Sequence, residues 1–211
     1  MNLKKELKEI HTQFLKDASP EAKRILNNAA EKLAHQNLKE SALKVGDKFP
    51  IFKLRNAIGE TIFSDDLLRE GPLVVNFYRG GWCPYCNLEL VGYQEILPEI
   101  QNLGAQLVAI SPELPDDSLD IIGRHSLKYE VLSDFNNELA KKAGLVFSLS
   151  EEMKSLYKGF GIDLVKPQGN KSYELPVPAT YVVDESGSII LSYVNIDYTD
   201  RLEPEEVLSV L

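Results

Sequence analysis

A nearly unbroken apolar run from Pro72 to Tyr78 is followed closely by two glycines and then by a helix-like segment from Pro84. A strand with one face in water alternates apolar and polar residues, whereas a strand buried on both faces is apolar throughout. Strands of the second kind occur almost only where helices cover both faces of a sheet. The run therefore predicts an α/β fold with three layers and marks one of its central strands.

Strand-like and helix-like segments alternate on both sides of this run. Residues 51–63 predict a β-hairpin, and residues 179–183 and 188–194 predict another, because turn residues separate their two halves. Antiparallel hairpins added to parallel strands predict a mixed central sheet. Residues 147–176 have no clear period and are predicted to form a long loop with a partial helix. The other expected elements are strands over 105–110 and 129–132, a short helix from 64, and helices over 84–102, 116–126, 136–144 and 202–211.

Residues 1–44 are predicted to form a helical extension in front of a domain over residues 45–211. A helix over residues 2–16 repeats apolar residues at a spacing that puts them on one face: Leu3, Leu7, Ile10 and Phe14. Ser19-Pro20 is typical of a helix start, and this second helix continues to about Gln36. The two helices form a hairpin that either packs on the domain as a lid or mediates dimerisation, and both alternatives stay open.

Charge and cysteine content narrow the function classes. The net charge of −9 opposes nucleic-acid binding, which needs a cationic surface. No apolar run approaches the length of about 18 residues that a membrane span needs, and the N-terminus lacks the apolar region of a signal peptide. We therefore expect a cytoplasmic protein. In that reducing compartment, two cysteines are more often catalytic or metal-binding than structural.

The two cysteines lie in the motif Trp82-Cys83-Pro84-Tyr85-Cys86, between the buried strand and a helix. Cys83 is expected at the N-cap and Pro84 at the first helical position. The positive end of the helix dipole lowers the pKa of a thiol there, and the two sulfurs are close enough to close a disulfide. We expect Cys83 to be the more exposed and more acidic thiol, and therefore the nucleophile.

A zinc half-site and purely structural cysteines are the alternatives to a reactive pair. Zinc needs two further Cys or His ligands, and the chain's histidines are isolated from one another: His11, His35 and His125. Structural cysteines are disfavoured because Gly80-Gly81-Trp82 predicts an exposed turn. We expect neither a metal nor another cofactor.

The motif resembles the active site of the thioredoxin superfamily, and Val177 to Asp184 resembles the strand that carries its cis-proline. This resemblance implies that the Val177–Pro178 bond is cis and lies against the cysteines, so that Val177 and Pro178 contact substrate. Residues 45–211 as a whole resemble the alkyl hydroperoxide reductase/thiol-specific antioxidant family, the peroxiredoxins. The likeness is strongest to their peroxiredoxin-like branch, through Phe77 to Cys86.

Some family features are missing at their usual positions. In the family register Cys86 falls on the reactive cysteine, Cys83 on a Thr or Ser, and Arg79 on a proline. The family's active-site arginine precedes the late strand, where this chain has Pro178. Asn76 stands where thioredoxins have a buried acid. Arg79 is the candidate replacement cation, with a solvated loop cation as its alternative role.

The resemblance implies a thiol-dependent antioxidant oxidoreductase that reduces hydroperoxides through a redox-active Cys83/Cys86 disulfide. It also implies an external thiol reductant of the thioredoxin, glutaredoxin or glutathione type. Trp82 is expected to be a substrate platform or, alternatively, a packing aromatic. The alternative functions are a protein disulfide reductase with little peroxidase activity, a non-catalytic redox-sensing module, and a dimer bridged by an iron–sulfur cluster. A homodimer without a cluster is also compatible with the N-terminal helices.

Overall fold

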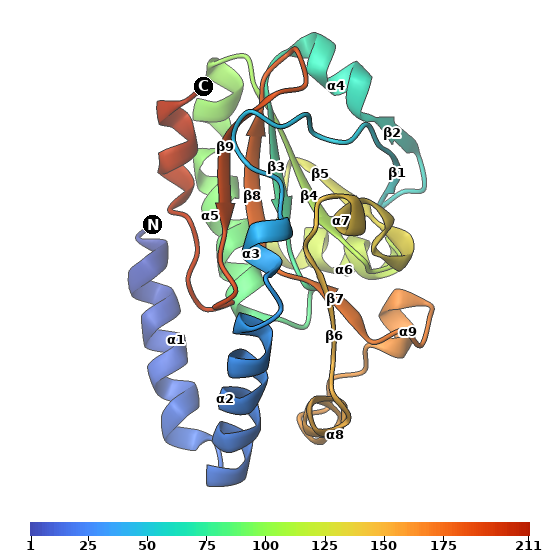
Figure 1. Ribbon diagram of the computed structural model, residues 1–211. Helices are drawn as coiled ribbons and strands as arrows, with labels where there is room; N and C mark the ends of the chain where they lie inside the picture. The colour runs from blue at the N-terminus through green and yellow to red at the C-terminus, as the bar shows by residue number, and fades with distance from the viewer.

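A seven-stranded mixed sheet forms the centre of the computed structural model, which describes residues 1–211 (Figure 1). The strand order is β2-β1-β5-β4-β3-β8-β9. β3, β4 and β5 are parallel, and every other pair in the sheet is antiparallel. The predicted three-layer, mixed α/β fold is confirmed. The strands are β1 (Lys53–Asn56), β2 (Thr61–Phe63), β3 (Leu73–Phe77), β4 (Gln106–Ser111), β5 (Glu130–Ser133), β8 (Ala179–Val183) and β9 (Ile189–Val194).

β3 lies between β4 and β8, and all its residues are buried, as the apolar run predicts. Successive side chains of a strand point to opposite faces of a sheet. Leu73, Val75 and Phe77 accordingly join one hydrophobic core, while Val74 joins a second core that also contains Tyr78. The strand that carries the cysteine motif at its end is therefore held from both sides.

Helices cover the two cores on opposite faces of the sheet (Figure 1). On one face lie α5 (Pro84–Asn102), with the bounds predicted, and α6 (Pro115–His125). On the other face lie α4 (Ser64–Glu70) and α7 (Glu138–Lys142). A short 3₁₀ helix, η1 (Phe135–Asn137), directly precedes α7. None of the helices combines the length and the apolar composition that crossing a membrane requires.

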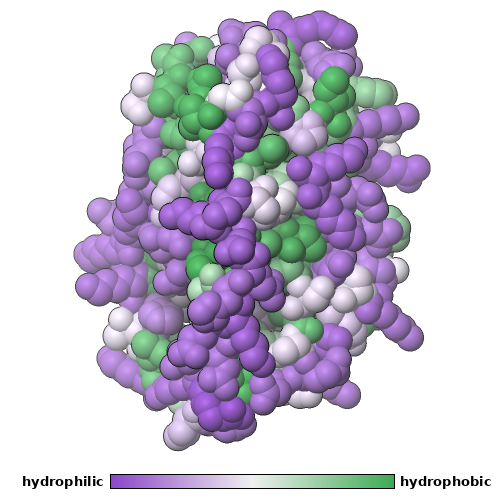
Figure 2. Space-filling model, in the orientation of Figure 1, coloured by the Kyte–Doolittle hydropathy of each residue, from purple (hydrophilic) through white to green (hydrophobic).

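The N-terminal helices pack on their own domain. They are α1 (Leu3–Asp17) and α2 (Pro20–Ala34), followed by the short α3 (Leu38–Ser41), and Ser19 caps α2 as predicted. Leu3 and Leu7 of α1 belong to the same core as α5. The surface over α2 is mostly hydrophilic in Figure 2. The hairpin thus packs on the domain with its apolar face inward, and a role in dimerisation stays a prediction.

Residues 147–176 are not mainly a loop, so that prediction is wrong. β6 (Val146–Ser148) and β7 (Glu174–Pro176) form a separate two-stranded sheet. The segment between these two strands contains α8 (Glu151–Gly159) and α9 (Val165–Gln168). These elements are too short to show a period in the sequence. The last helix is also shorter than predicted and is a 3₁₀ helix, η2 (Pro204–Ser209).

Candidate active site

The turn between β3 and α5 places both cysteines at a helix start. Cys83 is the N-cap of α5, with extended backbone at φ −92° and ψ 112°, and Pro84 begins the helix as predicted. Cys86 follows within the first turn. Gly80 has φ +147°, and a Cβ there would lie 2.6 Å from an oxygen of Glu113. The turn therefore requires glycine at this position.

Both cysteines are free thiols, and both side chains are 0% exposed. The expectation that Cys83 is the more exposed thiol is wrong, because distant segments cover the helix start. The hydroxyl of Tyr85 is hydrogen-bonded to Nδ1 of His11 on α1 at 3.2 Å. The ring of Tyr198, which follows β9, packs edge-on against Tyr85 with centroids 5.3 Å apart. The N-terminal hairpin and the C-terminal segment thus both reach the site.

Arg79 is a buried partner of Cys83, not a solvated loop cation. Its side chain is 4% exposed, and Nη2 donates a hydrogen bond to Sγ of Cys83 at 3.1 Å. Nη1 donates to the hydroxyl of Tyr157 at 3.2 Å, and the guanidinium lies 4.0 Å from the ring centroid of Tyr198. A buried cation is costly unless a counter-charge compensates it. The Cys83 thiolate is the group placed to do so.

A second buried arginine, Arg201, lies beside the other sulfur. Its Nε donates to Oε2 of Glu89 at 3.0 Å, and its Nη2 is 3.8 Å from Sγ of Cys86. A second arginine thus reaches the thiol pair from the segment after β9, and not from the Pro178 position. Likewise, a buried acid comes from Glu89 of α5, not from the Asn76 position. The sequence could have indicated Glu89, because it is an acidic residue on the inward face of a predicted helix. Nothing in the sequence around Arg201 indicated that this arginine belongs to the site.

The two sulfurs have opposite proton affinities. Burial opposes the thiolate of Cys83, but a hydrogen bond from Cys86 and the charges of Arg79 and Arg201 hold the pKa of Cys83 well below its ordinary value. Burial, together with the neighbouring Cys83 thiolate, holds the pKa of Cys86 well above it. The two arginines therefore favour the thiolate on Cys83 over the thiolate on Cys86. This arrangement supports the expectation that Cys83 is the more acidic thiol.

Trp82 lies beside this charged group and packs on other aromatic side chains. Its ring centroid is 5.4 Å from that of Tyr157 and 5.2 Å from the guanidinium carbon of Arg79. Its Nε1 is buried without a hydrogen-bond partner. The packing role of Trp82 is therefore evident in the structure, and its role in binding substrate stays a prediction.

The predicted cis bond between Val177 and Pro178 is wrong, since the chain contains no cis peptide bond. These residues join β7 directly to β8, and an extended trans connection continues from one strand into the next. The backbone N–H of Val177 donates to the carbonyl of Leu145 at 2.8 Å, and its side chain is 1% exposed. Val177 therefore has no free N–H with which to pair a substrate strand.

Glu113, in the loop after β4, supports the turn that carries the cysteines. Its Oε2 accepts a hydrogen bond from the backbone N–H of Gly81 at 2.8 Å. Burial raises the pKa of Glu113 to about 7, although that hydrogen bond opposes the shift. The loop sequence around Glu113 looks like an ordinary strand-to-helix connection, so only the tertiary structure identifies this contact.

The three histidines lie on different helices. His11 is bonded to Tyr85, His35 is the C-cap of α2, and His125 ends α6. No group of three or more His, Cys, Asp or Glu residues is arranged to hold a metal ion.

The sequence of this chain is similar to those of known proteins. The model of the AhpC/TSA family matches residues 45–192. A protein of Mycobacterium tuberculosis (strain H37Rv) that carries a peroxiredoxin name is 26% identical over 164 residues, which span 78% of this chain and 93% of that protein. The thiol-disulfide oxidoreductase ResA of Bacillus thuringiensis is 21% identical over 166 residues, 78% of either chain.

Solved structures show the same fold. The crystal structure of peroxidoxin BcpB from Mycobacterium tuberculosis superposes with a TM-score of 0.62, at 21% identity, over 80% of this chain and 96% of that one. A peroxiredoxin-like protein from Aquifex aeolicus superposes with a TM-score of 0.61, at 18% identity, over 80% and 85%. At these identities the likeness establishes the thioredoxin-like architecture alone.

Proposed function

The chain belongs to the AhpC/TSA family, and we propose that it reduces hydroperoxides through a disulfide that forms between Cys83 and Cys86. Membership of this family makes it an oxidoreductase of the thiol peroxidase type. The observation that carries the proposed mechanism is the 3.1 Å contact between Nη2 of Arg79 and Sγ of Cys83, inside a site closed to water.

The first step oxidises Cys83. Its thiolate attacks the terminal oxygen of ROOH, the O–O bond breaks, and Cys83 becomes a sulfenic acid. The departing RO⁻ takes the proton of the Cys86 thiol, which is hydrogen-bonded to Cys83. Arg79 already lies beside the sulfur, where it can stabilise the negative oxygen as the O–O bond breaks.

Arg79 has to contribute more than a lower thiol pKa. Lowering a thiol pKa from about 8.5 to about 7 raises the thiolate fraction at pH 7 from about 3% to about 50%. The nucleophilicity of the sulfur falls at the same time, so the net gain is only a few-fold. Fast peroxide reduction therefore requires a donor aimed at the leaving oxygen, and Arg79 is the donor that this site offers.

The second step forms the disulfide. Cys86, now a thiolate, attacks the sulfur of the Cys83 sulfenic acid and expels hydroxide, which solvent protonates to water. Arg201, 3.8 Å from Sγ of Cys86, favours that thiolate. Two equivalents of an external thiol, of the thioredoxin, glutaredoxin or glutathione type, then reduce the disulfide and become a disulfide themselves. The sum converts ROOH and two thiols into ROH, water and one disulfide.

Single-turnover kinetics test this mechanism. Trp82, the only tryptophan, reports the oxidation by its fluorescence when reduced protein meets hydrogen peroxide in a stopped-flow instrument. We expect Cys86→Ser to react once and leave a sulfenic acid on Cys83 that dimedone traps, and Cys83→Ser to be inactive. Dimedone on Cys86 in the Cys83→Ser protein would instead support the family register, in which Cys86 is the reactive cysteine.

Disulfide reduction is the second candidate function. Two cysteines in the first turn of one helix, and the likeness to a thiol-disulfide oxidoreductase, favour it. The hydrogen-bonded N–H of Val177 opposes it, because no free backbone donor remains there to pair with an extended protein substrate. The rate with a small disulfide, measured beside the peroxide rate, distinguishes the two functions.

A further inference from the structure

Neither sulfur of the site is accessible to solvent, so some part of its cover has to move before a substrate can react. Local opening of this kind usually occurs in the parts of a protein that have the fewest buried contacts. The cover consists of side chains from α1, from the segment after β9, and from α8.

Tyr157 of α8 separates Arg79 from a hollow on the surface. Its hydroxyl accepts the hydrogen bond from Arg79 at 3.2 Å, and its ring packs on Trp82. The same side chain also lines a pocket of about 550 Å³, together with Lys154, Lys158 and Tyr173 among others. One aromatic side chain thus stands between this pocket and the guanidinium that contacts Cys83.

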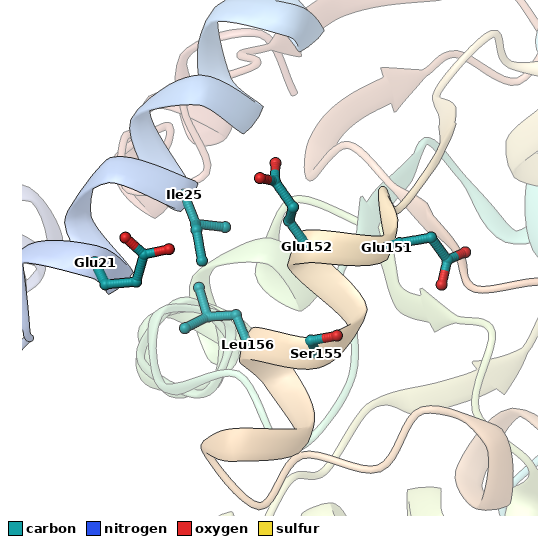
Figure 3. Close-up of a pocket in the computed structure, with 6 residues that line it drawn as sticks. All are labelled: Glu21, Ile25, Glu151, Glu152, Ser155 and Leu156. Atoms are coloured by element: carbon teal, nitrogen blue, oxygen red, sulfur yellow. The ribbon is translucent and has the colours of Figure 1, made fainter.

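The helix that carries Tyr157 is flanked by a second pocket, on its side toward α2. This pocket, of about 490 Å³, has Glu21 and Ile25 of α2 on one wall and Glu151, Glu152, Ser155 and Leu156 of α8 on the other. Figure 3 shows Ile25 and Leu156 pointing toward each other across the pocket. The salt bridge between the two helices, Arg24 to Glu152 at 3.7 Å, is about half exposed and contributes little.

α8 packs mainly in a hydrophobic cluster of its own. Met153 and Tyr157 belong to the smallest hydrophobic cluster, which has five buried residues, whereas the two clusters against the sheet have 22 and 17. Figure 1 shows α8 beyond the end of β6, away from the central sheet. α8 is therefore held mainly by a cluster separate from the core of β3 and α5, and Trp82 is the side chain that packs against both.

We propose that α8 is a lid on the thiol pair and that Tyr157 is its closing residue, which selects hydroperoxides by size. The pocket of Lys154, Lys158 and Tyr173 is the entrance, and it communicates with Cys83 when Tyr157 leaves Arg79. Hydrogen peroxide and short alkyl hydroperoxides pass through a small opening, whereas bulky aralkyl hydroperoxides require a larger one. The size selection rests on the proposed peroxidase function, but the lid itself does not.

Alkylation of the reduced protein by iodoacetamide at pH 7, located by mass spectrometry, measures the lid without any peroxide. We expect Tyr157→Ala to raise the rate constant for alkylation of Cys83, corrected for its thiolate fraction, by at least about tenfold. Without the Tyr157 ring, the reagent no longer has to wait for a rarely populated open state. Tyr157→Phe keeps the ring and loses only the hydroxyl, so its alkylation rate should stay much closer to wild type. In peroxidase assays, Tyr157→Ala should raise the rate with cumene hydroperoxide relative to the rate with hydrogen peroxide.

A variant remote from the sulfurs tests the helix itself. Ile25→Ala shortens the side chain that faces Leu156 and should raise the alkylation rate of Cys83, whereas Leu15→Ala, an exposed leucine of α1, should not. Unchanged alkylation in both Tyr157→Ala and Ile25→Ala would overturn the lid. Faster alkylation in these variants of a protein that does not reduce any hydroperoxide would support the lid and refute the peroxidase function.

Discussion

The side chain of Arg79 contacts both the sulfur of Cys83 and the aromatic side chains that cover the site. Replacing it therefore tests two effects, on the pKa of Cys83 and on the stability of the leaving oxygen. We expect Arg79→Met, which keeps most of the side-chain volume, to lower the rate of peroxide reduction by at least about tenfold, roughly 1.4 kcal/mol. The pKa of Cys83 should rise, because a cation that stabilises the thiolate is gone. Stopped-flow rates and the thiolate absorbance of Cys83 as a function of pH provide the two measurements.

A control variant and a second substrate show whether the loss of peroxide rate is specific to Arg79 and to the leaving oxygen. Arg69→Met, on the exposed face of α4, is the matched control and should leave the peroxide rate unchanged. Cleavage of a small disulfide by Arg79→Met should suffer less than peroxide reduction, because its leaving sulfur is less basic than an alkoxide. Equal losses with both substrates would mean that Arg79 acts only through the pKa of Cys83.

Glu113 predicts a dependence of stability on pH. Its pKa is about 7 in the folded protein and close to its usual 4.5 in the unfolded chain, so the folded state binds this proton more tightly. Stability should therefore fall as the pH rises from about 4.5 to about 7 and then level off. Glu113→Gln keeps an oxygen for the Gly81 N–H and removes the charge. Its stability should match wild type near pH 4 and exceed it by up to about 3 kcal/mol above pH 7.

Urea denaturation of the reduced proteins at a series of pH values measures this difference. The comparison of the two proteins cancels the contributions of all other titrating groups. A stability difference that is the same at pH 5 and pH 8 would show that Glu113 ionises normally and that its burial is relieved by water or by movement of the loop.

At the level of elements, α1 behaves as part of the domain core. Leu7 is 1% exposed and belongs to the core that contains α5, whereas Leu15 of the same helix is 42% exposed. We expect Leu7→Ala to lower the free energy of unfolding by about 2–5 kcal/mol. Leu15→Ala should change it by no more than about 0.5 kcal/mol. Urea denaturation compares the two variants, and equal small losses would mean that residues 1–44 are an appendage that unfolds on its own.

The elements also differ in how well their own sequence specifies them. The bounds of α5 and the cap of α2 follow from local chemistry: a proline at the first helical position and a Ser or Cys before it. α8 has an equally good cap, since the Ser150 side chain accepts a hydrogen bond from the N–H of Met153. The sequence predicted only a partial helix in this segment, because the nine residues of α8 are too few for a period to appear.

At the scale of the whole molecule, the fold gathers the site from segments far apart in the chain. Arg201 reaches a sulfur that is 115 positions away, and His11 reaches Tyr85 across 74. The two arginines bring two positive charges into the interior of a chain whose net charge is −9. Charge at the site and charge of the whole chain are therefore independent properties, and net charge said nothing about the chemistry of the thiols.

The sequence by itself determined the class of the fold, the place of Cys83 at a helix start, and Arg79 as a candidate cation. The first two properties depend on residues next to one another, through the continuous apolar runs of buried strands, the 3.6-residue period of helices, and capping, whereas Arg79 was indicated by the resemblance to the peroxiredoxins. Only the tertiary structure decided that both cysteines are buried, that Arg201, paired with Glu89, lies beside Cys86, and that the Val177–Pro178 bond is trans. Burial and electrostatic pairing depend on distance in space, and a local pattern carries no information on which remote segment will come within a few ångströms.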